Sequence, residues 1–182
     1  SPVAMASQTG DVDNEGNYLY VVNGDGTLGV FITNRAEKVM AWTKYTTAGD
    51  ILDVAVVEDV VYLYVKRTIN SSTVYHVEAL DNSYYTDASK QVTQSASATV
   101  SGLAHLNGQS CRVRADSSVM TNSTPSSGAI TLSRTATNIE VGLNFDVTIK
   151  TCHLNTSDAA YDLLYLEHGA RRTIQKQTEH TT

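Results

Sequence analysis

The sequence predicts an all-β protein, and three features carry that prediction. Short runs of Val, Ile and Tyr recur along the chain, and side chains of these types fit a pleated, half-buried surface. Polar clusters of Asn, Asp, Gly and Ser separate the runs at short, regular spacing, as turns do. The densest example is residues 41–67, which hold the only tryptophan, Trp42, and two runs that meet at Glu58-Asp59. We therefore expect hairpins in a sheet protein.

The first part of the chain, residues 17–82, predicts a propeller-like meander, preceded by an irregular lead-in at 1–16. The turn Asn23-Gly24-Asp25-Gly26 has residues that accept positive φ. Strands joined in sequence form the blades of a propeller, so two blade-like units fit here. The expected strands are 17–22, 27–33, 38–45, 51–57, 60–65 and 73–80.

Trp42 is expected to pack in the core of this part. Met40 and Trp42 share one face of their strand by the period of two. Trp42 would close the first blade-like unit, and residues 51–65 would open the second. If the indole is buried, Trp42→Ala should cost about 3 to 5 kcal/mol of stability.

The second part of the chain predicts a separate small domain. Residues 83–101 are polar and predict a linker. Residues 102–154 predict a small β-barrel or sandwich, with strands at 109–115 and 129–132 and one or two more in 139–153. Residues 155–182 form a C-terminal segment, in which Thr156 or Ser157 can cap a short helix that ends at Gly169.

Charge and composition exclude several function classes. The net charge of −6 argues against a surface that reads or tracks nucleic acid, which needs a basic patch. No run of 18 apolar residues predicts a membrane span. The first ten residues lack the basic start and apolar centre of a signal peptide. Because Ser1 comes first and no Met starts the chain, we expect an internal piece of a longer protein.

No motif in the sequence predicts catalysis, a cofactor or a metal ion. Cys111 and Cys152 are too far apart for a zinc motif and are read as buried thiols. Residues 11–16 resemble the opening of a calcium loop, but Val22 stands where that loop needs Glu, so a polar turn is favoured. Neither do the five histidines have metal-ligand spacing: His76, His105, His153, His168 and His180.

The acidic pairs Asp50/Asp53 and Glu58/Asp59 flank strands. A glycosidase needs two carboxylates across a cleft, so the solvated turn is the favoured interpretation. We therefore predict that the chain is not an enzyme and has no catalytic, cofactor-binding or metal-binding residues.

Tyrosine is the one unusual component of the composition. The chain has ten Tyr and two Phe. Tyrosine is large, stiff and amphipathic, so on a strand it can contact a sugar or a protein. Ordinary filling of strand positions explains the same excess, and the sequence leaves both interpretations open.

Two stretches resemble the tail nozzle proteins of short-tailed bacteriophages, also called tail tubular protein B. The first resembles the propeller-like part of that family and comprises Asn23-Gly24-Asp25-Gly26-Thr27-Leu28, Ala41-Trp42-Thr43, Thr47-Ala48-Gly49-Asp50, Val54-Ala55-Val56-Val57, Val61-Tyr62-Leu63-Tyr64-Val65 and Arg67.

The second stretch resembles the small β domain that follows the propeller. It departs from the family at Asp116-Ser117, where Asp-Gly is usual, so the tightness of that turn is open. It comprises Val100-Ser101-Gly102-Leu103-Ala104-His105-Leu106-Asn107-Gly108-Gln109, Val113, Ala115-Asp116, Gly128-Ala129-Ile130-Thr131-Leu132 and Val141-Gly142-Leu143.

The resemblance implies a structural protein of the virion tail, assembled in the host cytoplasm. Copies of such a protein form a ring, usually a hexamer, that conducts DNA from the capsid during ejection. The implied partners are other copies of the chain, the tail adaptor and the tail fibres or spikes, with DNA as transiting cargo. An acidic channel would suit that role, because phosphates would slide past it without binding.

Two other interpretations remain from the residues themselves. A carbohydrate-binding β module, or a fragment of a tail protein that binds or depolymerises host glycans, would explain the tyrosines and the turn carboxylates. A generic adhesin repeat is the third.

Overall fold

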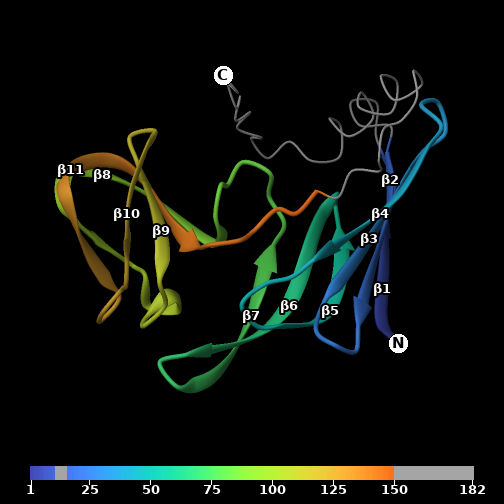
Figure 1. The fold of residues 1–182 in the computed structure, drawn as a ribbon, viewed down its shortest axis with the longest axis horizontal. Coiled ribbons are helices and arrows are strands. Elements are labelled where there is room, and N and C mark those ends of the chain that lie inside the picture. Colours follow the sequence, from blue (N-terminus) through green and yellow to red (C-terminus); the bar gives the residue numbers. More distant parts are fainter. Residues whose placement is uncertain (11–15, 150–182) are drawn as a thin grey trace, which may run out of the picture. The chain divides into compact units, whose positions relative to one another are not determined.

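Residues 1–10 and 16–149 fold into three antiparallel β-sheets (Figure 1). The computed structural model describes residues 1–10 and 16–149. These residues contain eleven strands and one short 3-10 helix. The all-β class predicted from the sequence is therefore confirmed.

The first sheet has the strand order β1-β2-β3-β4. Its strands are Pro2–Gln8, Asn17–Asn23, Leu28–Asn34 and Val39–Tyr45, so the predicted strands at 17–22, 27–33 and 38–45 are confirmed to within one residue. The irregular lead-in predicted for 1–16 is wrong over β1. Ala4 and Ala6 of β1 lie opposite Val22 and Tyr20 of β2. These core-facing side chains are small, and the larger apolar residues of β1, Val3 and Met5, are exposed, so β1 contributes little to the core by itself.

The second sheet, β5-β6-β7, contains the hairpin expected around Glu58-Asp59. Both turn residues have positive φ, 47° and 64°, as a two-residue type I′ turn requires. Asn70 and Ser71 form a second turn of the same kind, with φ of 48° and 63°. These turns join the meander of Asp50–Val57, Val60–Ile69 and Ser72–Ala79, in which the register shifts once, between Ile51 and Asp53 of β5.

The first two sheets pack face to face around one apolar core. Alternate side chains of each sheet point inward by the period of two, and the Ile51 N–H donates to the Gly26 carbonyl at 2.9 Å where the sheets meet. Gly26 has φ 78°, and a Cβ there would lie 2.8 Å from Asp50 Oδ1, so only glycine fits this junction. The core comprises Tyr20, Val22, Leu28, Val30, Ile51, Val54, Val61, Leu63 and Val65.

Trp42 does not belong to this core, so the packing role predicted for it is wrong. Trp42 is 63% exposed, and Met40 on the same face is 75% exposed. The period of two placed the two residues together correctly. It did not tell which side of the sheet faces the core, because both sides of β4 carry apolar residues.

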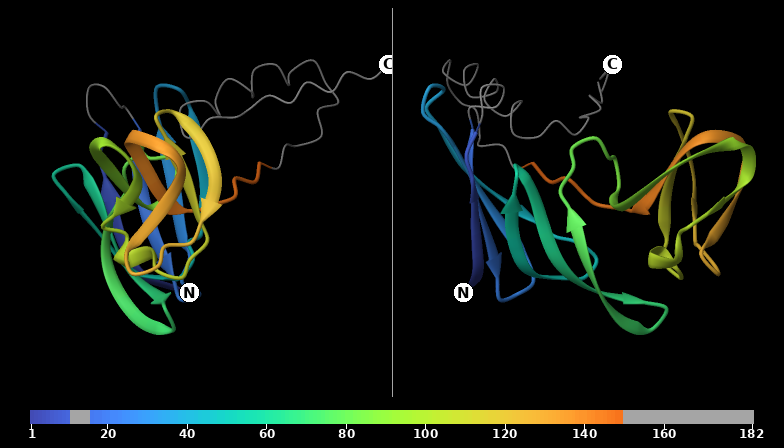
Figure 2. Two further views of the ribbon diagram at one scale, coloured as in Figure 1. Left: turned by 90° about the vertical axis from the view of Figure 1, so that its left-hand side faces the viewer. Right: turned by 180° about the vertical axis from the view of Figure 1, so that it is seen from behind.

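The third sheet has the order β10-β9-β11-β8 and its own core. Its strands are Asp87–Ser101, Cys111–Ala115, Ser118–Ser123 and Ala129–Leu143, and the 3-10 helix is Ala104–Leu106. β8 and β11 curve along their length (Figure 2), with irregular register at three places. β8 and β10 are edges, so the sheet does not close into a barrel, which was one of the two forms predicted for this part of the chain.

Two predicted boundaries in this region are wrong. Residues 87–101 of the predicted linker are strand β8. Its side chains are mostly polar because most of them are not buried; Val100 is the one buried residue of the strand. The strands predicted separately at 129–132 and 139–153 are joined in the single strand β11, which ends at Leu143.

The turn at Asp116-Ser117 is tight even without glycine. The two residues have φ of 45° and 67°, and Ala115 pairs directly with Ser118. Asp116 Oδ1 accepts hydrogen bonds from the backbone N–H groups of Asn138 and Thr137, at 3.0 and 3.1 Å. These bonds and one from the Thr137 hydroxyl lower the pKa of Asp116 to about 2. The Asp116 carboxylate therefore stabilises a tight turn, although Ser117 stands where the resembling family usually has glycine.

Several predictions fall outside the described residues. They are the polar turn at 11–16, of which only Gly16 is described, the short helix capped by Thr156 or Ser157 and ending at Gly169, and the positions of Cys152, His153, His168 and His180.

Candidate interaction surfaces

The outward face of the second sheet is rich in exposed tyrosine and valine. Alternate residues of β6 point inward, which leaves the others on the opposite face. Tyr62 and Tyr64 of β6 lie opposite Ala79 and Val77 of β7. We call this surface the tyrosine face and define it by its exposed large side chains, Val57, Val60, Tyr62, Tyr64, Tyr75 and Val77.

Two of the tyrosines on this face stack on each other. The ring centroids of Tyr64 and Tyr75 are 5.6 Å apart, with 16° between the ring planes. Each ring therefore uses one of its faces on the other. Sugar rings bind tyrosine by lying against an open ring face, so this arrangement suits a protein contact better than a flat sugar platform.

At its edge, the tyrosine face has one carboxylate in an ion pair and one outside any ion pair of the described residues. Lys66 Nζ lies 3.2 Å from Asp50 Oδ2, and both side chains are well exposed. Asp53 is exposed and opposite Tyr64, and its carboxylate accepts only from the N–H of its neighbour Val54, at 2.8 Å. Asp53 belongs to none of the ion pairs found among the described residues, so this face has one carboxylate without a cationic partner there.

The outward face of the first sheet is also apolar. Trp42 packs on Phe31 of β3, with ring centroids 5.0 Å apart. The indole also covers Gly29, where a Cβ would come within 3.5 Å of it. We call this surface the tryptophan face and define it by its exposed large side chains, Val3, Met5, Met40 and Trp42.

A buried arginine ties the second sheet to the loop before it. Arg67 is 2% exposed, and its guanidinium donates to both oxygens of Glu78 at 2.7 Å and to the Ala48 carbonyl at 3.0 Å. Asp87 Oδ2 lies 3.6 Å from Arg67 Nη2. Burial alone would lower the pKa of Arg67, but the bond to Glu78 and the charges of Glu78 and Asp87 raise it overall. Sequence reasoning named Arg67 only as part of the resemblance and did not predict its burial or its partners.

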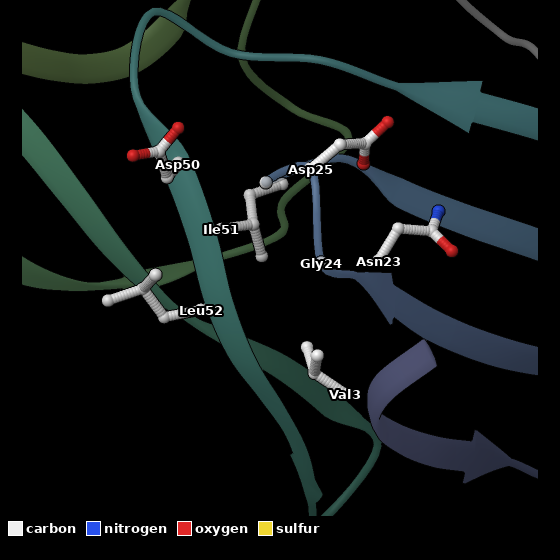
Figure 3. A pocket seen from close by; sticks show the side chains of 8 residues that line it. Val3, Asn23, Gly24, Asp25, Asp50, Ile51 and Leu52 are labelled. Carbon is white, nitrogen blue, oxygen red and sulfur yellow. The ribbon is translucent and has the colours of Figure 1, made fainter. Parts of the chain in front are cut away.

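A shallow cleft of about 310 Å³ lies where the turn at 23–26 meets the start of β5 (Figure 3). Two of the residues that line it, Asp25 and Asp50, are acidic. Asp25 accepts from the hydroxyl and N–H of Thr27, which lowers the pKa of its carboxyl group. Asp50 is bound to Lys66. Each of the two exposed carboxylates thus has a partner within the protein, Thr27 for Asp25 and Lys66 for Asp50.

The structure describes only some of the residues considered as chemical groups in the sequence, because Cys152, His153, His168 and His180 lie outside the described residues. In the described residues, no three His, Cys, Asp or Glu side chains are close enough to hold a metal ion. Glu58 and Asp59 form a hairpin turn. Cys111 is buried in β9, as expected, and burial raises the pKa of its thiol to about 11.

Glu140 is a buried carboxylate that the sequence did not single out. It is 4% exposed, and its Oε1 accepts from the Tyr85 N–H at 2.7 Å and from the Thr86 and Ser89 hydroxyls at 3.0 Å. The Arg114 guanidinium lies 4.3 Å from the centroid of the Tyr85 ring. Glu140 therefore holds the segment before β8 against β11, which is a structural role.

No protein-family model and no curated protein matches this chain. Along residues 1–10 and 16–149, no helix is long and apolar enough to cross a membrane.

Proposed function

We propose that the chain is a structural subunit of the tail of a short-tailed bacteriophage. In this role it forms part of the ring-shaped nozzle that conducts DNA from the capsid during ejection. One observation carries the proposal: two sheets pack face to face, and each also has an apolar outward face. Large exposed apolar patches mark surfaces that other protein covers. A subunit with such a face on either side of its core is suited to a stacked assembly.

The proposal that the assembly is a phage nozzle rests on the resemblance of the turns and strands to nozzle proteins. The resembling turn Asn23-Gly24-Asp25-Gly26 is the one that joins the two sheets through Gly26. The resembling residue Arg67 is the buried guanidinium that ties the loop before β5 to β6. The resemblance thus falls on residues with specific structural tasks, which supports a shared architecture.

The proposed partners follow from the same role. They are other copies of the chain in a ring, the tail adaptor above it and the fibres or spikes attached to it. DNA passes through as cargo, and the net charge of −6 is compatible with a channel wall that repels phosphate. The proposed location is the tail of the virion.

A carbohydrate-binding module is the second candidate, and the three exposed tyrosines of one face favour it. The mutual stacking of Tyr64 and Tyr75 leaves fewer ring faces open to a sugar. We therefore rank this function below the nozzle.

Binding to purified adaptor complexes of short-tailed phages tests the proposal. The chain, mixed with adaptor rings and centrifuged through a gradient, is expected to sediment with them. Negative-stain images of that fraction should show a ring extended below the adaptor. The same protein on a glycan array should give no signal. Failure to sediment with any adaptor, together with specific glycan binding, would replace the nozzle with the second candidate.

A further inference from the structure

The tyrosine face and the tryptophan face have similar exposed apolar areas. The exposed fractions are 36–71% for the six side chains of the tyrosine face and 60–75% for the four of the tryptophan face. With side-chain areas of roughly 150–250 Å², each face offers about 500 Å² of apolar surface. A stable interface buries about 800 Å² on each partner, polar rim included. Each face is therefore large enough to be the apolar centre of one interface.

The two faces carry charges of opposite sign: Lys44 on the tryptophan face forms one long ion pair, and Asp53 on the tyrosine face forms none among the described residues. Lys44 is the one charged residue at the outward positions of β1 to β4, and its nitrogen is 3.9 Å from Asp25, at the limit of an ion pair. The tyrosine face contributes Asp53, which has no cationic partner among the described ion pairs. A face with a weakly held cation fits a face with a free carboxylate.

Packing of one sheet on another already occurs inside the chain, between the inward faces. The inward faces of the first and second sheets pack on each other around one core. If the tyrosine face of one copy covers the tryptophan face of the next, the same sheet-on-sheet packing continues from copy to copy. That contact is head-to-tail, and repetition of it closes a ring when the rotation between copies allows.

We propose that copies of this chain associate head-to-tail, with the tyrosine face of one copy against the tryptophan face of the next. The inference deepens the proposed nozzle and rests on it for the choice of a second copy as the partner. It names the two surfaces that form the ring contact. Tyr64 and Tyr75 on one side and Trp42 on the other are the central aromatic residues of the interface.

Two variants, one for each face, test this contact. Val77→Lys places a charge on the tyrosine face, and Met40→Lys places one on the tryptophan face. Val119→Lys is the matched control, because Val119 is 79% exposed on β10, outside both faces, and Val77 is 71% exposed on β7. Sedimentation velocity over a range of concentrations measures association. Fluorescence of Trp42, the only tryptophan, reports its burial.

The unaltered chain and Val119→Lys are expected to associate alike, with a blue shift of Trp42 emission as concentration rises. Val77→Lys and Met40→Lys should each weaken association by roughly tenfold or more, since each puts a charge at the centre of an apolar contact. An equimolar mixture of these two variants should recover a dimer, because each retains the face that the other has lost.

Three results would overturn the inference. The unaltered chain could stay monomeric at every concentration. One face variant could dimerise alone as well as the unaltered chain, which would indicate a contact between like faces. The mixture of the two variants could fail to form a dimer. If adaptor binding persists with any of these three results, the inference fails and the proposed nozzle function stands. If the head-to-tail pattern holds without adaptor binding, the nozzle function fails and the contact stands.

Discussion

Replacing Arg67 with methionine is expected to destabilise the protein more than any single change on its surface. Methionine fills much of the volume of the arginine stem but removes the guanidinium. Glu78 then loses a bidentate partner held at 2.7 Å, and the Ala48 carbonyl loses a donor at 3.0 Å. The loop before β5 loses its bond to β6, and the second sheet loses a link between β6 and β7.

The magnitude follows from the burial of the partners. Removing one member of a buried ion pair costs about 3 to 5 kcal/mol, because the other charge is left without compensation. The side chains of Glu78 and Asp87 are 22% and 27% exposed, so water replaces part of the lost interaction. We therefore expect the lower end, about 3 kcal/mol. For a chain of this size that corresponds to a fall in Tm of about 6 to 12 °C.

Urea unfolding followed by circular dichroism measures this change, and Lys66→Met is the control. Lys66 is next to Arg67 and also forms an ion pair, but both partners are exposed, so its loss should change stability by less than about 0.5 kcal/mol. The double variant Arg67→Met/Glu78→Gln should recover about 1 kcal/mol or more, because it removes the unpaired carboxylate. A cost below about 1 kcal/mol for Arg67→Met would refute this account of the buried network.

Three further predictions test the backbone, the pH dependence and the surface. Gly49→Ala should lower the free energy of unfolding by more than about 2 kcal/mol, because a Cβ at φ 151° would collide with the backbone of β6. Gly102→Ala should lower it by only about 1 kcal/mol, because Gly102 has φ 83° and open space around it. Urea unfolding measures both changes. Because the pKa of Asp116 is lowered to about 2, its contribution to stability is present above pH of about 4 and is lost as the pH falls through about 2. Urea midpoints should show that loss, and Asp116→Asn should reduce it; an unchanged pH profile would contradict the prediction. Trp42→Ala should lower the free energy of unfolding of the monomer by less than about 1.5 kcal/mol, since Trp42 is 63% exposed. A loss of about 3 kcal/mol or more would indicate that Trp42 is buried in a core.

The sequence predicted the strands whose signal is local. The strand pair 51–57 and 60–65 has dense β-branched residues, and Glu58-Asp59 marks the turn between them, so the hairpin was readable from neighbours alone. β1 and β8 were missed because their stability comes from residues far away in the sequence. Ala4 and Ala6 pack only because Val22 and Tyr20 lie opposite them.

The sequence predicts which side chains of the candidate surfaces share a face, but not whether that face is exposed. Alternation along 60–68 puts Tyr62, Tyr64 and Lys66 on one face, so the period of two would have gathered the tyrosines. Whether that face points to the core or to solvent could not be predicted, because the inward residues of the same strand are equally apolar. Trp42 was misplaced for the same reason. Where both sides of a sheet carry apolar side chains, composition does not tell core from interface.

Electron microscopy of the chain bound to an adaptor ring would show the assembly and the contact between its copies together. A closed ring with a central channel is expected, in which Trp42 of each copy lies against Tyr64 and Tyr75 of its neighbour. A bound chain that forms no ring, or a ring in which Trp42 stays exposed to solvent, would contradict this expectation.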